Sequence, residues 1–496
     1  MANSMNSPMK NPTLQDPLIR MTAREAVAAL KNRDVSPAEL IDAAAKRIAA
    51  VEPQVNALPT LCLDRGRAFA ASLQHPETPP PGYLYGLPVA IKDLVPVQGV
   101  RFTSGSMAFA DHIASYSDYA VQRLEARGAT VIAKANTPEF GAGAQTFNEV
   151  FGTTKNPWNT ALTPAGSSGG SAVAVATGEV WLADGSDLGG SLRIPASFCG
   201  IVGLRPSPGR VVWGPRALPF DSMSVLGPMG RNVGDCALML DAQVGWEPRD
   251  PISLPAPERS FVEAVDHAMA LGRLPSRFAG GCRIAWTPDL GLTPVDAEVR
   301  EICEAAMKRL EKLGATVGTD APDFSGAEEC FQVLRAANFA ASVWPRIEGK
   351  TALVKPEVIW NAEKGLKLTG EEIAVAQRQR GAITNRLIAF FETHDFLVLP
   401  TAVAPPFDHR MRYLEEVGGR KFDTYISWLV LTFAITLTGT PAISVPAGFT
   451  KSGLPVGLQI VARPRGEAEL LALSALLEAD LGLASHVPVD PIVGTA

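Results

Sequence analysis

Two clusters of glycine and serine flank one short apolar segment in the first half of the sequence. Residues 164–171 read PAGSSGGS, residues 184–193 read DGSDLGGSLR, and the segment between them, 172–177, is small and apolar. Glycine tolerates backbone conformations and close approaches that other residues cannot, so both loops can turn their N–H groups toward one point. One such cluster would equally suit a flexible loop, whereas two clusters around a helix favour a site that binds an oxyanion.

The sequence around these clusters has the pattern of an α/β protein. From residue 85 to 210, short apolar runs such as 87–91 and 129–133 alternate with Gly-rich turns and helical stretches. A helix is predicted at 467–481, and further strands are predicted near the C-terminus at 396–399, 442–446 and 456–461. We therefore expect strands from both parts of the chain to join one sheet.

The remaining segments set the domain organisation. Residues 1–18 are polar and interrupted by prolines, and we expect a flexible tail there. Capping-box patterns at 22–25 (TARE) and 36–39 (SPAE) each predict the start of a helix. Residues from about 250 to 395 indicate mainly helices with polar faces and no chemical motif, so we expect them to shape a pocket made elsewhere. Because no linker-like segment separates these parts, the sequence predicts one domain over residues 19–490.

Composition limits the class of partner. Of 496 residues, 46% are hydrophobic and 19% charged, which is typical of a soluble globular protein. The net charge of −6 and the lack of a Lys/Arg-rich run argue against nucleic acid. The apolar stretches are too short to span a bilayer, and the N-terminus lacks the apolar segment of a signal peptide. We expect a cytoplasmic protein without a membrane partner.

The cysteines give no metal or redox motif. They are spread too widely for C-x-x-C pairs, and we expect reduced, buried side chains at Cys62, Cys199, Cys236, Cys282, Cys303 and Cys330. The sequence therefore implies no metal and no organic cofactor.

A nucleophilic serine needs a base, and histidine is the usual candidate. None of the six histidines lies in a Gly-rich or catalytic-looking context: His75, His112, His267, His394, His409 and His486. Residues 166–170 do satisfy G-x-S-x-G, so an α/β-hydrolase with Ser168 as nucleophile is the formal alternative. Neither a strand before this motif nor a Ser–Asp–His order with suitable flanks is evident.

Lysine is the other candidate base. Lys92 ends an apolar run (GLPVAIKD, residues 86–93), and burial there would lower its pKa toward neutral pH. The alternative is a structural lysine paired with the adjacent Asp93 or with another carboxylate. Lys134 and Lys155 rank behind Lys92, because their neighbours suggest hydrogen bonds that anchor loops.

Three motifs in a fixed order resemble the amidase signature family: a Lys-Asp pair at 92–93, the first Gly/Ser cluster, and the second cluster continued through Pro195 and Ala196. Further matches cover nearly all of the chain except the tail and the middle helices: 103–106 (TSGS), 136–140 (NTPEF), 156–158 (NPW), 198–206 (FCGIVGLRP), 227–231 (GPMGR), 446–448 (PAG) and 454–459 (LPVGLQ). The resemblance implies a single large α/β domain, a mixed β-sheet core surrounded by helices, with its signature core at about 85–235.

The resemblance also implies roles for individual residues. Ser191 falls on the nucleophile, and Ser167 falls on the serine that relays a proton to Lys92. Ser167 is expected to follow a cis peptide bond after Gly166. Neutral Lys92 would take the proton and later return it to the leaving nitrogen, with an acyl-enzyme on Ser191 between the two steps.

The same comparison places the groups around the nucleophile. The oxyanion hole falls on the backbone N–H groups of Leu188, Gly189, Gly190 and Ser191. Gly166, Asp187 and Arg193 are expected to support the loops through their conformation and hydrogen bonds.

The departures from the family pattern leave this set intact. Ala165 replaces a usual glycine, and Ser186 replaces a usual threonine but keeps a hydroxyl. Ile194 stands where glutamine-using amidotransferase subunits that act on transfer RNA usually carry glutamine. We therefore disfavour that role, and with it a partner that receives ammonia.

The resemblance implies a hydrolase of carbon–nitrogen bonds other than peptide bonds, of the amidase, aryl-acylamidase or urethanase type. We expect a small-molecule amide, anilide or carbamate substrate with apolar groups, and accompanying ester cleavage. A homodimer is left open. A non-catalytic role in a larger complex is the alternative from another class, and the presence of Lys92, Ser167 and Ser191 disfavours it.

The substrate pocket follows no readable code in the sequence. We expect the helices from 320 to 390, and the loops near Phe147, Trp213 and Trp428, to line it. Their apolar character suggests aryl or alkyl groups on the substrate.

Overall fold

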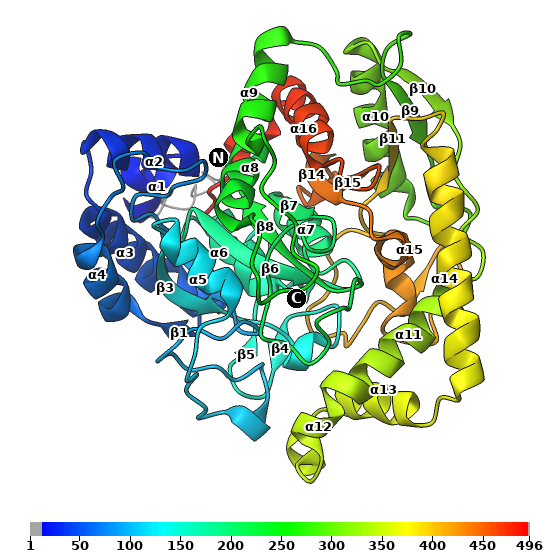
Figure 1. Ribbon diagram of the computed structural model, residues 1–496, viewed down its shortest axis with the longest axis horizontal. Coiled ribbons are helices and arrows are strands. Elements are labelled where there is room, and N and C mark those ends of the chain that lie inside the picture. The colour runs from blue at the N-terminus through cyan, green and yellow to red at the C-terminus, as the bar shows by residue number, and fades with distance from the viewer. Residues whose placement is uncertain (1–11, 495–496) are drawn as a thin grey trace, which may run out of the picture.

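Eleven strands lie side by side in one sheet, in the order β1-β3-β2-β6-β8-β7-β14-β15-β11-β9-β10 (Figure 1). The computed structural model describes residues 12–494. The strands of this sheet are β1 (Thr60–Leu61), β2 (Pro88–Lys92), β3 (Thr130–Ala135), β6 (Leu182–Asp187), β7 (Val202–Arg205), β8 (Val225–Gly230), β9 (Arg283–Trp286), β10 (Thr316–Thr319), β11 (Phe396–Pro400), β14 (Ala442–Phe449) and β15 (Pro455–Ala462). Two short hairpins lie apart from it: β4 (Phe147–Asn148) with β5 (Gly152–Thr153), and β12 (Glu416–Val417) with β13 (Arg420–Lys421).

The sheet is mixed, and it joins the two parts of the chain that the sequence assigns to strands. β2 runs parallel to β3 and β6, and β9 runs parallel to β10 and β11. The strands between these groups are antiparallel, including the pair β7 and β14, which come from distant parts of the sequence. β2 and β3 are buried along their whole length because helices cover both faces of a parallel region. The predicted single α/β domain with a mixed sheet surrounded by helices is confirmed.

The α-helices surround this sheet (Figure 1). They are α1 (Pro17–Arg20), α2 (Ala23–Asn32), α3 (Pro37–Val55), α4 (Leu63–Ser72), α5 (Tyr119–Ala126), α6 (Gly169–Thr177), α7 (Arg193–Cys199), α8 (Val233–Gln243), α9 (Phe261–Leu271), α10 (Ala297–Lys312), α11 (Ala327–Ser342), α12 (Trp344–Ile347), α13 (Pro356–Leu366), α14 (Gly370–Phe390), α15 (Val430–Thr438) and α16 (Glu467–Leu481). Short 3-10 helices are η1 (Pro12–Gln15), η2 (Met107–Phe109), η3 (Glu139–Gly141), η4 (Thr351–Leu353), η5 (Ser427–Leu429) and η6 (Leu483–His486).

Local sequence signals explain several of these boundaries. Thr22 and Ser36 form the two predicted capping boxes, with Glu25 and Glu39, at the starts of α2 and α3. Every residue of α6 is buried, which its alanine and valine side chains permit, and the helix ends at Gly178 in the left-handed conformation. The short apolar segment between the two Gly/Ser clusters is therefore a core helix.

The middle of the chain departs from its prediction as a mainly helical region. Residues 250–395 do contain α9 to α14, but they also supply β9 and β10 at one end of the large sheet. β10 is an edge strand whose residues are mostly exposed, so no apolar run marks it in the sequence. Of the predicted flexible tail, residues 1–11 lie outside the described part of the chain, and residues 12–18 include η1 and the start of α1.

Helices α11 to α15 form a group beside the sheet. α11 packs on α13, α14 and α15, and Phe331 of α11 stacks on Phe433 of α15 with ring centroids 4.5 Å apart. In Figure 1 these helices occupy the yellow-green to orange side of the molecule. This packing brings one face of α11 to the loop that follows β6, because Phe331 also lies against Gly189.

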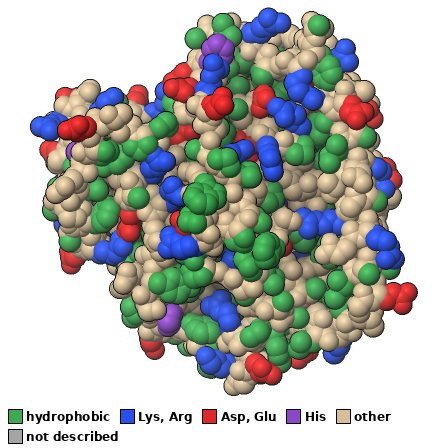
Figure 2. Space-filling model, in the orientation of Figure 1, with side chains coloured by type: hydrophobic (Ala, Val, Ile, Leu, Met, Phe, Trp, Pro, Cys, Tyr) green, Lys and Arg blue, Asp and Glu red, His purple; other side chains and the backbone are tan. Residues whose placement is uncertain are grey.

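The surface and the cysteines give simpler observations. Acidic, basic and hydrophobic side chains are interspersed over the face drawn in Figure 2. Within residues 12–494, every helix is too short or too polar to cross a membrane. All six cysteines are free thiols, and five of them are buried as predicted. Cys62 is only half-buried, so the prediction of burial is wrong for this residue.

Candidate active site

Lys92 is the last residue of β2, and its side chain is completely buried. Its Nζ lies 2.7 Å from Ser167 Oγ, 2.9 Å from Ser168 Oγ and 3.0 Å from Ser186 Oγ. No carboxylate in the described part of the chain lies within ion-pair distance of this nitrogen. Three hydroxyls therefore form the polar surroundings of the Lys92 amine.

This environment favours the neutral amine. Burial lowers the pKa of Lys92 from 10.5 to about 7, while the charges of Asp184 and Asp187 act in the opposite direction. Hydroxyls suit both forms, since each can accept a hydrogen bond from an ammonium or donate one to the lone pair of an amine. Lys92 can thus gain or lose a proton near neutral pH without leaving a partner unsatisfied.

Asp93 does not pair with Lys92, so that alternative is wrong. Its carboxylate lies 3.0 Å from Nζ of Lys134, which also donates to the backbone carbonyl of Val95 at 2.8 Å. The register explains the choice: Ile91 of β2 lies opposite Lys134 of β3. Side chains alternate along a strand, so Asp93 shares the face of Ile91 and Lys134, and Lys92 points to the other face.

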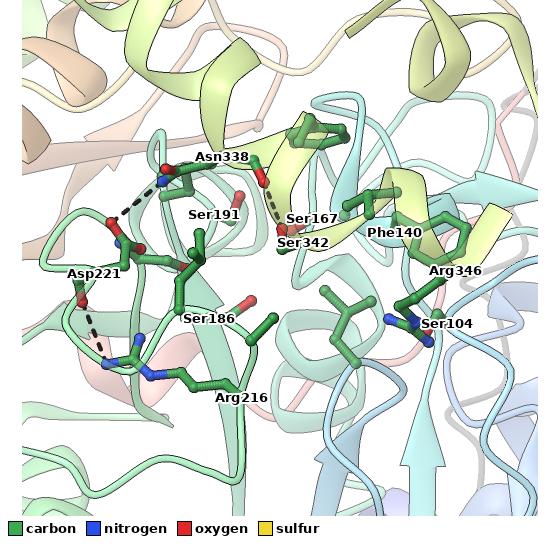
Figure 3. Close-up of a pocket in the computed structure, with 18 of the residues that line it drawn as sticks. Ser104, Phe140, Ser167, Ser186, Ser191, Arg216, Asp221, Asn338, Ser342 and Arg346 are labelled. Carbon is green, nitrogen blue, oxygen red and sulfur yellow. Dashed lines mark hydrogen bonds between the residues drawn. The ribbon is translucent and has the colours of Figure 1, made fainter. Parts of the chain in front are cut away.

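The two Gly/Ser clusters meet at the carboxyl ends of β2 and β6. The Gly166–Ser167 peptide bond is cis, as the family resemblance implies. The backbone N–H of Ser168 donates to the carbonyl oxygen of Ser191 at 3.2 Å, which joins the two loops. Ser167, Ser186 and Ser191 face the same cavity, of about 580 Å³ (Figure 3).

Ser168 is placed differently from these serines. It is fully buried, lies outside the cavity wall and donates to the carbonyl oxygen of Ser186 at 3.3 Å. The G-x-S-x-G alternative requires an accessible hydroxyl with a histidine base. The geometry of Ser168 does not provide this.

A buried carboxylate fixes the loop that carries Ser191. Asp187 accepts hydrogen bonds from the backbone N–H groups of Gly190 at 2.9 Å and Leu192 at 3.2 Å, and from Arg193 Nε at 3.0 Å. Burial by itself would raise the pKa of Asp187, but the charges of Arg193 and Arg205 outweigh it and hold the pKa well below its usual range. The carboxylate therefore stays ionised and holds the loop in one path.

The four predicted oxyanion donors are not equivalent. Leu188, Gly189 and Ser191 line the cavity, whereas Gly190 N–H already donates to Asp187. The carbonyl of Gly189 accepts a hydrogen bond from Thr432 Oγ1 at 2.6 Å, so both ends of this peptide unit are engaged. Gly190 has φ +117°, and a Cβ there would collide with the Thr432 side chain, which explains the need for glycine.

The opposite wall of the cavity comes from α11 and α12. Phe331, Arg335 and Phe339 recur every fourth residue of α11, and Arg346 follows on α12. The prediction that helices from 320 to 390 form the wall did not single out these side chains. A stripe of aromatic and basic residues at helical spacing was the available signal, and it could not be told from an ordinary packing face.

The other predicted wall positions have mixed outcomes. Trp213 lines the cavity, and its ring centroid lies 4.8 Å from the guanidinium carbon of Arg216. Trp428 is buried outside the cavity wall, although Tyr425 and Ile426 of the same segment line it. Phe147 also lies outside the wall, with Lys355 Nζ 5.0 Å from its ring centroid.

Comparisons with known proteins identify the family of the chain. A protein family model described as Amidase matches residues 39–471. An acylamidase from Rhodococcus erythropolis is 35% identical, covering 95% of this chain and 98% of its own length. A glutamyl-tRNA(Gln) amidotransferase subunit from Synechococcus sp. (strain CC9902) is 33% identical, covering 94% of this chain and 97% of its own.

Two solved structures of hydrolases are also similar to the chain. A bacterial aryl acylamidase, described as an amidase signature enzyme, superposes with a TM-score of 0.86 at 25% identity, covering 96% of this chain and all of that one. A 6-aminohexanoate cyclic dimer hydrolase with bound substrate superposes with a TM-score of 0.82 at 28% identity, covering 93% and 97%.

Proposed function

The chain belongs to the amidase signature family, hydrolases of carbon–nitrogen bonds other than peptide bonds, and we propose that it cleaves small-molecule amides, anilides or carbamates through an acyl-enzyme on Ser191. The observation that carries this proposal is the surroundings of Lys92. A buried amine with a pKa near 7 contacts Ser167 Oγ, and both Ser167 and Ser191 face one cavity.

The steps follow from this arrangement. Neutral Lys92 takes the proton of Ser167 while Ser167 takes the proton of Ser191, and Ser191 Oγ bonds to the carbonyl carbon of the substrate. The proton then returns through Ser167 to the nitrogen, the carbon–nitrogen bond breaks, and the amine leaves. Water attacks the acyl-enzyme with the same proton path and regenerates the free Ser191 hydroxyl.

Backbone donors would stabilise the negative charge on the carbonyl oxygen. We assign this task to the N–H groups of Leu188, Gly189 and Ser191, whose residues line the cavity. Gly190 N–H serves instead to hold the loop through Asp187. This assignment narrows the four donors that the family resemblance implies to three.

The cavity wall favours substrates with aryl or alkyl groups. Phe331, Phe339 and Trp213 contribute aromatic surface. The acylamidase and aryl acylamidase among the similar proteins support amide cleavage. We also expect matched esters to be cleaved, because an alkoxide or phenoxide leaves with less protonation than an amine.

A glutaminase role within an amidotransferase is the second candidate, since amidotransferase subunits are among the relatives. Ile194 disfavours it, because this apolar, buried residue stands where glutamine is usual in those subunits. Release of ammonia from free glutamine at a rate similar to anilide cleavage would reverse this preference.

The test is a substrate panel with a matched nucleophile variant. Purified protein is given an anilide, a carbamate, a primary amide and an ester, each with the same acyl or alkyl group. Ser191→Ala should lower kcat by about 10⁴-fold or more on every substrate that the parent cleaves. Circular dichroism should show an unchanged fold, and activity within about tenfold of the parent would contradict the proposal.

A further inference from the structure

Arg335 lies on the cavity-facing side of α11 and is only 5% exposed. Its guanidinium donates to Asn361 Oδ1 and to the hydroxyl of Tyr425, the latter at 2.6 Å. The ring centroids of Phe339 and Tyr425 lie 4.5 and 5.3 Å from the guanidinium carbon of Arg335. Aromatic rings and two neutral hydrogen-bond partners therefore surround this buried cation.

No described carboxylate lies within ion-pair distance of Arg335. Glu357, on the same helix as Asn361, pairs instead with Arg412. Burial raises the pKa of Tyr425, which keeps the phenol neutral despite the opposing charge of Arg335. A buried charge is costly unless an opposite charge or a full set of hydrogen bonds compensates it.

Other buried arginines are compensated. Arg193 and Arg205 share the carboxylate of Asp187. Arg231 donates to the backbone carbonyls of Ile19, Met21, Val175 and Val180. Arg335 has neither arrangement, and it differs from these residues in facing the cavity.

The acidic residues of the cavity wall are already engaged. Asp221 accepts from the backbone N–H groups of Met223 and Ser224 and from Asn338 (Figure 3). Asp118 accepts from two further backbone N–H groups. These carboxylates are therefore held by other donors, and Arg335 has no carboxylate partner in the described cavity wall.

We infer that Arg335 binds an anionic group of the substrate, of the carboxylate class, and that the enzyme prefers amides that carry one. This inference rests on the proposed function for the reacting centre. A guanidinium can hold both oxygens of a carboxylate, and the aromatic rings around it exclude the water that would weaken the pair.

The position of Arg335 sets the spacing within the substrate. Phe331, one helical turn earlier, lies against Gly189 beside the proposed oxyanion site, so Arg335 stands about 5–10 Å further along the cavity. The carboxylate should therefore be separated from the reacting carbonyl by several bonds.

Arg346 provides a matched control at the same cavity. It is the more exposed of the two residues in the structure, and its guanidinium donates to Ser104 Oγ at 3.3 Å. The guanidinium carbon lies 5.2 and 5.0 Å from the ring centroids of Phe109 and Phe140, and partial burial lowers the pKa of Arg346. Water screens the charge of Arg346 more than that of the less exposed Arg335, so we expect Arg346 to contribute less than Arg335 to binding of an anion.

The test measures equilibrium binding in a Ser191→Ala background, where no turnover is expected. Calorimetry compares each acid with its methyl ester: the mono-4-nitroanilide of glutaric acid, with the charge on the acyl side, and 4-acetamidobenzoate, with the charge on the amine side. In at least one pair the acid should bind roughly ten- to a hundredfold more tightly than the ester. Arg335→Gln should bring this ratio close to one, Arg335→Lys should keep part of it, and Arg346→Gln should keep nearly all of it.

Several outcomes would overturn the inference. They are equal binding of acid and ester in both pairs, no binding of any of the four probes, or a ratio that survives Arg335→Gln or disappears with Arg346→Gln. If Arg335→Gln does not fold, the inference is judged from two other affinity ratios of acid to ester. One is measured in the Ser191→Ala protein, and the other in the same protein with Arg335→Lys added. Turnover by the parent is scored separately, so binding through Arg335 without amide cleavage would contradict the proposed function and leave this inference standing.

Discussion

Lys92 and Lys134 are two lysines on neighbouring parallel strands, and the protein uses them in opposite ways. Both side chains are at most 1% exposed. Lys134 has a carboxylate partner, Asp93, on its own face of the sheet, whereas Lys92 has three hydroxyls on the other face. An ion pair keeps an amine charged, while uncharged hydroxyls allow burial to lower its pKa. The partner, and not burial alone, therefore separates a structural lysine from a candidate base.

Exchanging each lysine for methionine should separate the two roles by the largest margin. Lys92→Met removes the proposed base, so kcat/KM should fall by about 10³-fold or more. Lys134→Met leaves the buried Asp93 carboxylate without its charged partner and with the hydrogen bonds from Thr103, so the free energy of unfolding should fall by about 3–5 kcal/mol. Denaturant unfolding and amide hydrolysis of both variants provide the measurement. Similar activity losses in the two variants, both explained by unfolding, would remove the distinction between the two lysines.

The leaving group offers a more specific test of Lys92. An amine leaves poorly unless it is protonated, while a phenoxide departs with little help. Lys92→Ala should therefore reduce kcat/KM for an amide by roughly ten- to a hundredfold more than for the ester with the same acyl group. Ser167→Ala should show the same trend more weakly, since water can occupy the place of the relay. A greater loss for the ester would refute the double role of Lys92 as proton acceptor and donor.

The pH profile tests the same amine in the intact protein. Burial lowers the pKa of Lys92 to about 7, and only the neutral form can accept the proton of Ser167. kcat/KM should therefore rise about tenfold per pH unit below pH 7 and level off at alkaline pH. A maximum well below pH 6 in folded protein would contradict a lysine base.

Asp118 requires a control in that experiment, because burial raises its pKa to about 7 and it also lines the cavity. Asp118→Asn removes this titration. The shape of the profile should persist in the variant, whatever its absolute rate. Loss of the rise would assign the ionisation to Asp118.

Removal of one hydroxyl around Lys92 should have the smallest effect. Ser186→Ala deletes one of the three partners of Nζ, so kcat/KM should fall by about three- to tenfold. Ser171→Ala is the matched control, because Ser171 is also buried but donates to the carbonyl oxygen of Asp184, away from the Lys92 amine. Equal kinetic effects of the two substitutions would mean that the Ser186 hydroxyl acts only through stability.

The sequence predicts the fold well where apolar runs are long. β2, β3, β11, β14 and β15 and the helix α16 lie where their hydrophobic patterns place them. β9 and β10 were not predicted, because each has only four residues and β10 is mostly exposed. β9 pairs with β11 and β10 pairs with β9, and no local pattern in the sequence encodes this pairing.

The candidate active site shows the same contrast between residues that local motifs predict and residues that only tertiary packing brings together. The residues that bring Lys92, Ser167 and Ser191 together lie in motifs, so the family resemblance locates them. The Asp93–Lys134 pair depends on the register of β2 and β3, and sequence proximity pointed to Lys92 instead. The proposed role of Arg335 depends on how α11, α13 and the segment near Tyr425 pack together. The sequence shows only a stripe of aromatic and basic residues on α11, which cannot be told from an ordinary packing face.

Covalent labelling tests the central claim most directly. A fluorophosphonate reacts with an activated serine, and peptide mass spectrometry identifies the residue that carries the adduct. We predict one adduct on Ser191, formed faster as the pH rises through 7 and absent in Ser191→Ala. Labelling should be slowed strongly in Lys92→Met and retained in a folded Lys134→Met. An adduct on Ser168, or labelling of Ser191 that proceeds equally well without Lys92, would contradict the account.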